Sequence, residues 1–363
     1  MAINIGKERK RLIMEWIGKK PKLTPMIELD LTNSCHKILI KDEGKNSTET
    51  YKDKHGWMMG LDYLKNHFPE QFVYYLGSTG NAGLADFAFA DELNRLIGEK
   101  RVMVANFYPM HYDGKILGPD SKGRFTDGRK FRECMEGFLS GRVIRVDFKK
   151  RYWFDDLDKG VTPCLDKMNE LSVGEEIGIS SITRFNSRDI TEGFDPTYHQ
   201  VMEEIAGQLK EKYGRIPRAL MIVQFGAGML YEDSKALARA KGLPIDLMAV
   251  STGNRETIAD KICDSSETWQ ENLRDLRCKG FTKSKKDGSR IYNVTEREIL
   301  FALKTMGKHD IEAEASGAAG LAMALSDRLG DIVANDDNLG GLEDYELVVV
   351  INTGNGIKKI TEI

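Results

Sequence analysis

The chain has 363 residues and a formal net charge of −3 at neutral pH, from 53 basic and 56 acidic side chains. This length supports about two domains with a sizeable core, and the balanced charge excludes an electrostatic case for nucleic-acid binding. No apolar run approaches the ~20 residues that a membrane-spanning helix needs, so no membrane partner is expected. The 5 cysteines are scattered without a Cys-x-x-Cys pair, which indicates reduced thiols in a cytoplasmic protein and no metal site.

The first informative segment leads from an apolar run at 38–40 into a lysine-rich turn. The apolar run predicts a strand, and apolar residues at helical spacing between 57 and 64 predict a helix after the turn. Lys52 therefore stands at the start of a helix, beside the end of a strand. A partly desolvated lysine at a helix N-terminus is expected to have a lowered pKa and to be nucleophilic. Alone, the pattern is more typical of a solvated surface lysine.

A second segment, Gly77-Ser78-Thr79-Gly80-Asn81-Ala82-Gly83, follows the strand-like run 72–76 and opens a predicted helix. Small residues here allow backbone amides to face a ligand, and a helix N-terminus favours an anion such as a carboxylate. The alternative is a tight turn capped by a serine or asparagine side chain.

A third segment, Gln224-Phe225-Gly226-Ala227-Gly228, lies between a predicted strand at 219–223 and a predicted helix at 229–241. A short glycine loop before a helix is typical of a phosphate site. The third glycine of a dinucleotide fingerprint is replaced by Tyr231, and no P-loop lysine follows, so a single phosphate is favoured over a pyrophosphate. The alternative is a structural turn.

The fourth segment places Thr353 directly after the apolar run 347–351. A hydroxyl at the carboxyl end of such a strand faces the crevice where open α/β sheets bind ligands. Strand-like and helical stretches alternate along the whole chain. The predicted fold class is therefore α/β, with two domains that are each a mostly parallel sheet covered by helices.

In their order along the chain, these segments resemble the fold-type II pyridoxal-phosphate enzymes, the superfamily of the tryptophan synthase β subunit. Residues 46–54, Asn-Ser-Thr-Glu-Thr-Tyr-Lys-Asp-Lys, are similar to the family motif Asn-Pro-Thr-Gly-Ser-Phe-Lys-Asp-Arg. Glu192-Gly193 with 203–209, and 314–320, are similar to two further family segments. Six collinear motifs are far more specific than any one of them.

The resemblance implies pyridoxal 5′-phosphate as the cofactor and an amino acid as the substrate. It implies that Lys52 is the Schiff-base lysine and the general base, and that Thr353 faces the pyridine nitrogen. A neutral hydroxyl there favours elimination or replacement over transamination. The remaining implied contacts are Asn81 to the ring oxygen, Ser78, Thr79, Gly80 and Asn81 to the substrate carboxylate, and the amides of Phe225, Gly226, Ala227 and Gly228 to the phosphate.

Family topology implies a smaller mobile domain at 50–185, which carries Lys52 and the substrate loop. A larger cofactor domain at 1–49 and 186–363 holds the phosphate loop, and a homodimer is expected. The Thr-Gly-Asn-Gly-Ile-Lys ending looks most like threonine synthase, which implies β/γ-elimination or replacement on an O-activated amino acid. Glu49 departs from this pattern, because it stands where the family has glycine and brings a negative charge.

Three other interpretations stay open. They are a β-replacement synthase of the cysteine synthase type, a serine/threonine dehydratase, and a non-catalytic pseudoenzyme subunit. Two features are not assigned by the resemblance. His55, one helical turn past Lys52, is expected on the helix surface or in a supporting role, with a position facing the cofactor as the alternative. The segment 110–130 looks inserted and is most simply an exposed loop, with a lid or a partner contact as the alternative.

Overall fold

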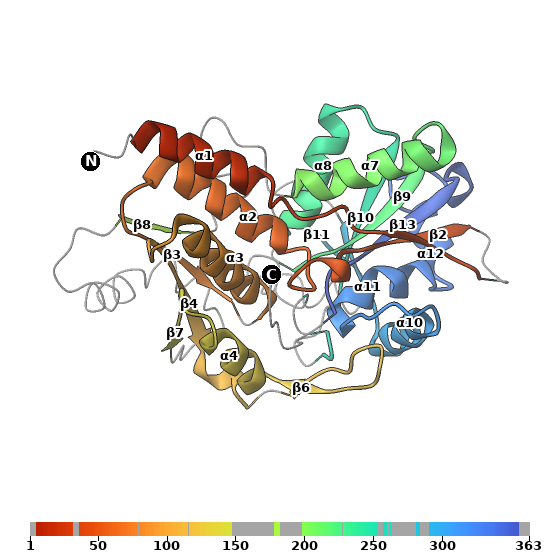
Figure 1. Cartoon of the computed structure of the whole chain (residues 1–363). Coiled ribbons are helices and arrows are strands. Elements are labelled where there is room, and N and C mark those ends of the chain that lie inside the picture. The colour runs from red at the N-terminus through yellow and green to blue at the C-terminus, as the bar shows by residue number, and fades with distance from the viewer. Residues whose placement is uncertain are drawn as a thin grey trace.

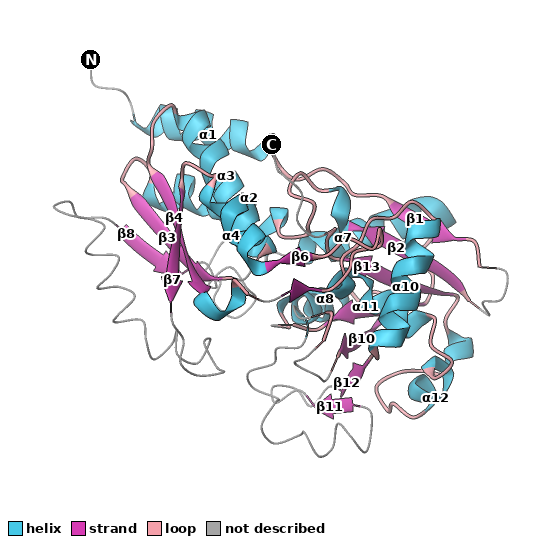
Figure 2. Ribbon diagram, turned by 90° about the horizontal axis from the view of Figure 1, so that it is seen from below, coloured by secondary structure: helices cyan, strands magenta, loops and turns pink. Residues whose placement is uncertain are grey.

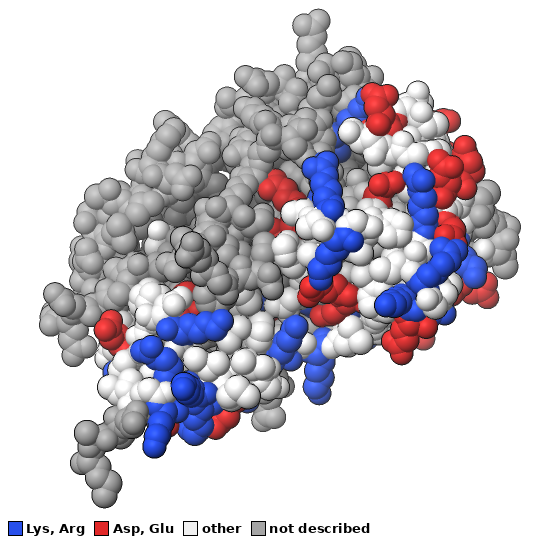
Figure 3. Space-filling model, turned by 90° about the horizontal axis from the view of Figure 1, so that it is seen from above, with Lys and Arg blue, Asp and Glu red and all other residues white. Residues whose placement is uncertain are grey.

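The computed structural model describes residues 5–31, 36–78, 80–114, 116–146, 178–181, 198–226, 228–252, 257–259, 262, 281–283 and 290–355. The chain forms two lobes, each built around its own sheet (Figure 1). The predicted α/β class, with mostly parallel sheets covered by helices, is confirmed. None of the described helices is long and apolar enough to cross a membrane. On the face shown in Figure 3, basic and acidic side chains lie beside one another over much of the described surface.

The larger sheet has 7 strands in the order β1-β2-β13-β9-β10-β12-β11. The five strands from β2 to β12 in this order run parallel, and the edge strands β1 and β11 are antiparallel to their neighbours. The central strands β9 and β13 are buried at every position, which explains their continuous apolar sequence. The strand bounds are β1 Met26–Leu29, β2 Lys37–Asp42, β9 Ala219–Gln224, β10 Ile245–Ser251, β11 Phe281–Lys283, β12 Arg290–Asn293 and β13 Leu347–Asn352.

Helices cover both faces of this sheet, so each face contributes to its own core (Figures 1 and 2). One face packs against α7 (His199–Tyr213) and α8 (Met229–Ala240). The other packs against α10 (Glu296–Lys308), α11 (Ala315–Ala324) and α12 (Leu329–Ala334). Glycines let α11 approach the sheet closely, because a Cβ at Gly320 would lie 3.1 Å from the Ile222 carbonyl oxygen.

The smaller sheet has 4 parallel strands in the order β7-β4-β3-β8. They are β3 (Phe72–Gly77), β4 (Val102–Pro109), β7 (Gly141–Val146) and β8 (Gly178–Ser181). The core of this lobe is shared with α1 (Ile5–Ile17), α2 (Asp53–Asp62), α3 (Asn81–Ile97) and α4 (Gly128–Glu136). The predicted range 1–49 assigns α1 to the larger domain. On this point it differs from the structure, in which α1 packs in the core of the smaller lobe.

Two tryptophans attach α1 to α2. The indole Nε1 of Trp16 donates to the Trp57 carbonyl at 2.9 Å, and the indole Nε1 of Trp57 donates to the Trp16 carbonyl at 3.0 Å. Both side chains are buried, and Gly60 of α2 lies directly against the Trp16 ring. Because α2 begins immediately after Lys52, this contact also helps to fix the position of the lysine.

Gly60→Ala is expected to lower the free energy of unfolding by about 1–3 kcal/mol, because the added methyl group overlaps the Trp16 indole. Gly207→Ala is the matched control: Gly207 is an exposed helical glycine of α7, with nothing within 4 Å of an added Cβ. That control should stabilise the protein by about 0.5–1 kcal/mol. Urea unfolding of both variants measures the difference, and equal effects would contradict the packing argument.

The segment 110–130 bridges the two lobes (Figure 1). It contains β5 (Ile116–Leu117) and β6 (Thr126–Asp127), and it continues into α4. Ser121 donates its amide to the Ala313 carbonyl at 2.8 Å, and its hydroxyl accepts from the Ala313 amide at 3.0 Å. Residues 122–125 are exposed, as the simplest prediction of an ordinary loop has it, but Ser121 is attached to the larger lobe. These two hydrogen bonds connect the smaller lobe to the residue before Glu314.

Candidate active site

The parallel register of the larger sheet brings three predicted segments to one edge. Strands β2, β13 and β9 are neighbours, so their carboxyl ends meet there. The turn after β2 then pairs with the segment after β13 through a bridge between Thr50 and Gly354. The carbonyl of Thr353 accepts from the Tyr51 amide at 3.3 Å and from the Thr50 hydroxyl at 3.0 Å. The structure thus places the buried Thr353 beside the loop that carries Lys52, as the sequence predicts.

Lys52 is the N-cap residue of α2, and its amine lies between two tyrosines. The Nζ atom donates to the Tyr198 hydroxyl at 2.8 Å, and it lies 4.6 Å from the ring centre of Tyr51 and 5.1 Å from that of Tyr198. Burial is the largest influence on the pKa of Lys52 and lowers it, but the phenolic oxygens of Tyr198 and Tyr51 outweigh burial and raise it. The expected lowering of this pKa is therefore wrong, because the sequence does not reveal the contact with Tyr198.

Asn81, the first residue of α3, faces the lysine loop. Its Nδ2 atom donates to Oε1 of Glu314 at 3.1 Å, and the Glu314 amide donates to the Gly354 carbonyl at 3.0 Å. A Cβ at Gly354 would lie 3.1 Å from Nδ2 of Asn81 and 3.2 Å from the Glu49 carbonyl oxygen. Segments from both lobes therefore meet here, and a side chain at position 354 would fill the space between them.

The predicted substrate loop begins with a serine that stabilises the loop itself. The Ser78 hydroxyl accepts from the amides of Gly80 at 3.2 Å and Gly83 at 3.3 Å, so it performs the capping role that the alternative interpretation gives it. The Gly80 amide is thereby engaged within the loop. Thr79 lies outside the described residues.

The glycine loop after β9 keeps part of its predicted role. The Phe225 amide donates to the Val250 carbonyl at 2.7 Å, because the pairing of β9 with β10 continues one residue past the strand. Its prediction as a phosphate-binding amide is therefore wrong in this structure. Gly228 has a φ of 83°, in the region that favours glycine, and a Cβ there would lie 2.8 Å from the Phe225 ring. Gly226 and Gly228 stay candidates, and Ala227 lies outside the described residues.

Glu49, in the position of the family glycine, has a φ of 59°. A non-glycine residue in this left-handed conformation costs about 1–2 kcal/mol. Its carboxylate is half-buried and interacts electrostatically with Arg124 of the bridging segment, whose guanidinium is also paired with Asp120 at 2.6 Å. Glu49 therefore holds a backbone conformation that favours glycine, while its side chain adds a negative charge next to Lys52.

A buried network of four charges surrounds the first turn of α2. The Nζ atom of Lys54 lies 2.7 Å from Oε2 of Glu43 and 3.3 Å from Oε1 of Glu204, and Nζ of Lys41 lies 2.7 Å from Oε2 of Glu204. The side chains of Lys41, Glu43 and Lys54 are fully buried. The network joins β2, α2 and α7, so it fixes the backbone that presents Lys52. Sequence reasoning missed it, because charged residues in a turn normally indicate solvent.

His55 is buried, and its Nδ1 atom lies 3.0 Å from Oδ1 of Asp86. The predicted surface position is therefore wrong, and the supporting position fits. Asp86 belongs to α3 and also acts on Tyr198 electrostatically. The surroundings of Lys52 thus include an aromatic pair and, beyond it, a histidine–aspartate pair.

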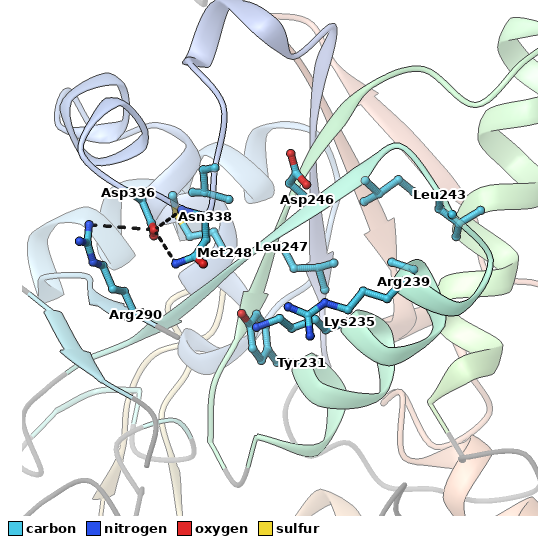
Figure 4. Close-up of a pocket in the computed structure, with 14 residues that line it drawn as sticks. Tyr231, Lys235, Arg239, Leu243, Asp246, Leu247, Met248, Arg290, Asp336 and Asn338 are labelled. Carbon is cyan, nitrogen blue, oxygen red and sulfur yellow. Dashed lines mark hydrogen bonds and ion pairs between the residues drawn. The ribbon is translucent and has the colours of Figure 1, made fainter. Parts of the chain in front are cut away.

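A cavity of about 250 Å³ lies elsewhere in the larger lobe (Figure 4). Its wall includes Tyr231, Lys235 and Arg239 of α8, Asp246 of β10, and Arg290 with Asp336. Lys235 and Arg239 lie in the carboxyl half of α8 and Asp246 near the amino end of β10, while Tyr231 lies in the first turn of α8; the lining includes none of Lys52, Asn81, Gly226, Gly228 and Thr353. The cavity is therefore separate from the site around Lys52.

Comparison of the whole structure with solved structures finds matches over nearly the full chain. A pyridoxal 5′-phosphate-dependent aspartate racemase matches with a TM-score of 0.61 and 14% identity, over 99% of this chain and 98% of the other. Serine racemase from Dictyostelium discoideum matches with a TM-score of 0.62 and 16% identity, over 97% and 98%. These matches show that the chain has the fold known as fold type II.

Diaminopropionate ammonia lyase from Escherichia coli shares the fold-type II fold as well. It matches with a TM-score of 0.58 and 15% identity, over 96% of this chain and 88% of the other. The sequence itself matches no protein-family description and no curated protein. At these identities the comparisons establish the fold alone.

Proposed function

We propose that the chain is a pyridoxal 5′-phosphate-dependent enzyme that carries out elimination or replacement on an amino acid. The observation that carries the proposal is the position of Lys52, a primary amine at the start of α2, in a loop that pairs with the segment after β13 at the carboxyl edge of the larger sheet. The residues at that edge fit the cofactor. Lys52 would hold its aldehyde carbon, Asn81 its ring oxygen, Gly226 and Gly228 its phosphate, and Thr353 its ring nitrogen. When bound, the cofactor supplies the electron sink for chemistry at Cα.

The residues of the chain supply proton transfer and orientation. Lys52 would act as the general base that takes the proton from Cα of the amino acid. Asn81 and the start of α3 orient the substrate carboxylate, which the helix N-terminus favours. Contacts between the lobes at Gly354, Asn81 and Ser121 hold the two lobes together, and exclusion of water between them would favour the reaction.

The leaving group distinguishes two versions of this function. The segment after β13 and the loop at Ser78 support a threonine-synthase-like reaction on an O-activated substrate such as O-phosphohomoserine. Glu49 favours a second candidate, the dehydration of serine or threonine, because its carboxylate repels a phosphorylated substrate. Both versions require Lys52 and the same cofactor contacts.

Glu49→Gly tests this point with two readouts. We expect unfolding to require about 1 kcal/mol more free energy, because glycine adopts the left-handed conformation without strain. We also expect kcat/KM for O-phosphorylated substrates to rise on the order of tenfold relative to serine, since like charges near a protein surface repel by about 1–2 kcal/mol. Asp310→Gly is the matched control, with a φ of 57° far from Lys52 in sequence. Unchanged selectivity would contradict the charge argument.

The test of the proposed function is the visible absorbance of the purified protein with and without added pyridoxal 5′-phosphate. The spectrum is then repeated with O-phosphohomoserine, O-phosphoserine, O-acetylserine, serine and threonine. A cofactor band that changes with one of them supports the proposal and identifies the class of leaving group. A protein that stays colourless with added cofactor would overturn it and favour a non-catalytic subunit.

A homodimer and a cytoplasmic location stay predictions from the sequence resemblance and the reduced cysteines. Light scattering of the purified protein measures the first. A monomeric particle at working concentration would contradict it.

A further inference from the structure

Tyr198, which none of the sequence motifs singled out, contacts the amine of Lys52 directly, together with Tyr51 of the lysine loop. It is fully buried immediately before α7, and its hydroxyl accepts from Nζ of Lys52 at 2.8 Å. Its ring centre lies 5.0 Å from that of Tyr51. Its amide donates to Oδ2 of Asp233 at 3.3 Å, which connects it to α8, the helix that follows the glycine loop. The phenol is thus held rigidly beside the reacting nitrogen.

A phenol in this position interacts with both states of the lysine. It accepts a hydrogen bond from the ammonium, and it donates one to the lone pair of the neutral amine. Burial raises the pKa of Tyr198, and the opposing effect of Lys52 is smaller, so the phenol keeps its own proton at neutral pH. The described groups that face this pair are Tyr51 from the lysine loop and, through Tyr198, Asp86 of α3 with its partner His55.

We propose that Tyr198 is a second catalytic residue, which holds the proton on Lys52 between its removal from the substrate and its delivery to the leaving group. The inference rests on the proposed function and adds a substrate class to it. The pair suits amino acids whose leaving group must be protonated, such as a hydroxyl or an amino group.

The protons balance without another reactant. The neutral amine of Lys52 takes the Cα proton and becomes an ammonium, which the Tyr198 oxygen stabilises. When the bond from carbon to the leaving oxygen breaks, the ammonium returns this proton to the oxygen, water departs, and the amine is neutral again. Tyr198 ends with the proton with which it began. A phosphate leaves as a stable anion and does not need this step.

Tyr198→Phe removes only the hydroxyl, and elimination is followed by the 2-oxo acid formed from serine and from O-phosphoserine. We expect kcat for serine to fall on the order of 10²-fold, as for the loss of a general acid, and kcat for O-phosphoserine to change by less than about threefold. Tyr63→Phe is the matched control, a buried tyrosine whose hydroxyl donates to the Glu70 carbonyl at 2.7 Å. Equal losses with both substrates, or a wild-type enzyme that uses only O-phosphoserine, would overturn the inference.

A second measurement does not depend on turnover. The full chain is freed of any bound aldehyde with hydroxylamine and dialysed. Competitive acetylation at pH 8 and peptide mass spectrometry then give the reactivity of Lys52. In Tyr198→Phe we expect acetylation about tenfold faster than in the wild type, which corresponds to one unit of pKa, because burial is then opposed only by Tyr51 and no longer by Tyr198. Exposed Lys212 provides the internal reference. Unchanged acetylation of Lys52 in Tyr198→Phe would overturn the proposed pairing of Tyr198 with Lys52 and leave the proposed function standing. Faster acetylation in a protein that binds no pyridoxal 5′-phosphate would support the pairing and count against the proposed function.

Discussion

Lys52→Ala is expected to lower turnover by at least ~10³-fold, because it removes both the nucleophile for the cofactor and the base for the Cα proton. The glycine loop and Asn81 are left intact, so weak binding of pyridoxal 5′-phosphate should persist without covalent attachment. Product formation measures the first effect, and borohydride reduction followed by mass spectrometry of the peptide that contains residue 52 measures the second. This change has the largest effect that the proposed function predicts.

Two further variants separate the loss of the Lys52 amine from the loss of its charge and from the effect of an ordinary surface substitution. Lys52→Arg keeps a positive charge beside Tyr198 but lacks a nucleophilic amine, so it is expected to be as inactive as Lys52→Ala. Lys45→Ala removes an exposed lysine from the same turn, and its activity should stay within about twofold of wild type, as for other surface substitutions. Turnover of Lys52→Ala within tenfold of wild type would exclude Lys52 as the catalytic base.

Glu43→Gln is expected to lower the free energy of unfolding by about 3–5 kcal/mol, because it leaves Lys41 and Lys54 buried with too little negative charge. The Thr24 hydroxyl and the Asn46 amide also donate to this carboxylate, at 2.6 and 2.8 Å, so their hydrogen bonds weaken too. Urea unfolding at pH 7 measures the loss. Lys212→Met breaks the exposed pair with Glu28 and is the control, with an expected change below about 1 kcal/mol.

The same network predicts how stability depends on pH. Burial alone would raise the pKa of Glu43, but the ammonium groups of Lys54 and Lys41 outweigh burial and lower it. The pKa of Glu43 in the folded protein therefore lies below its value of about 4.3 in the unfolded protein. The contribution of such a carboxylate to the free energy of unfolding is fully present at neutral pH. This stabilisation is lost as the pH falls below about 4 toward the folded pKa. Wild-type stability should therefore decline more steeply in acid than that of Glu43→Gln, and parallel profiles would contradict the assignment.

Much of the fold was predictable because the larger sheet is buried on both faces. Its central strands β9 and β13 are continuous apolar runs, and each ends in small or polar residues that mark the start of a loop. The same reasoning located β2 and β3, and the helices that follow the Lys52 and Ser78 loops. The position of α1 was not predictable, because its packing depends on Trp16 meeting Trp57, 41 residues further along the chain.

Within the candidate site, the motif residues were predictable and their partners were not. Lys52, Asn81 and Thr353 each follow a local strand-to-loop pattern. The parallel register of the larger sheet brings the segments of Lys52 and Thr353 together, and Asn81 reaches them from the smaller lobe near Gly354. Tyr198 lies 146 residues from Lys52, and Glu204 lies 163 residues from Lys41, without a local pattern that connects either pair. The Phe225 amide was predicted to be free for a ligand, but it donates to the Val250 carbonyl of the neighbouring strand β10.

The sequence by itself determined the α/β class and the order of the loops, because local apolar periodicity and turn residues encode strands, helices and the loops between them. Only the tertiary structure decided the contact of Lys52 with Tyr198, the network of four charges at the start of α2 and the bridge between the lobes. Those properties depend on which distant groups come within a few ångströms of one another in a region that excludes water. In such a region a single phenol or carboxylate can shift the pKa of a neighbouring group away from the direction that the local sequence predicts.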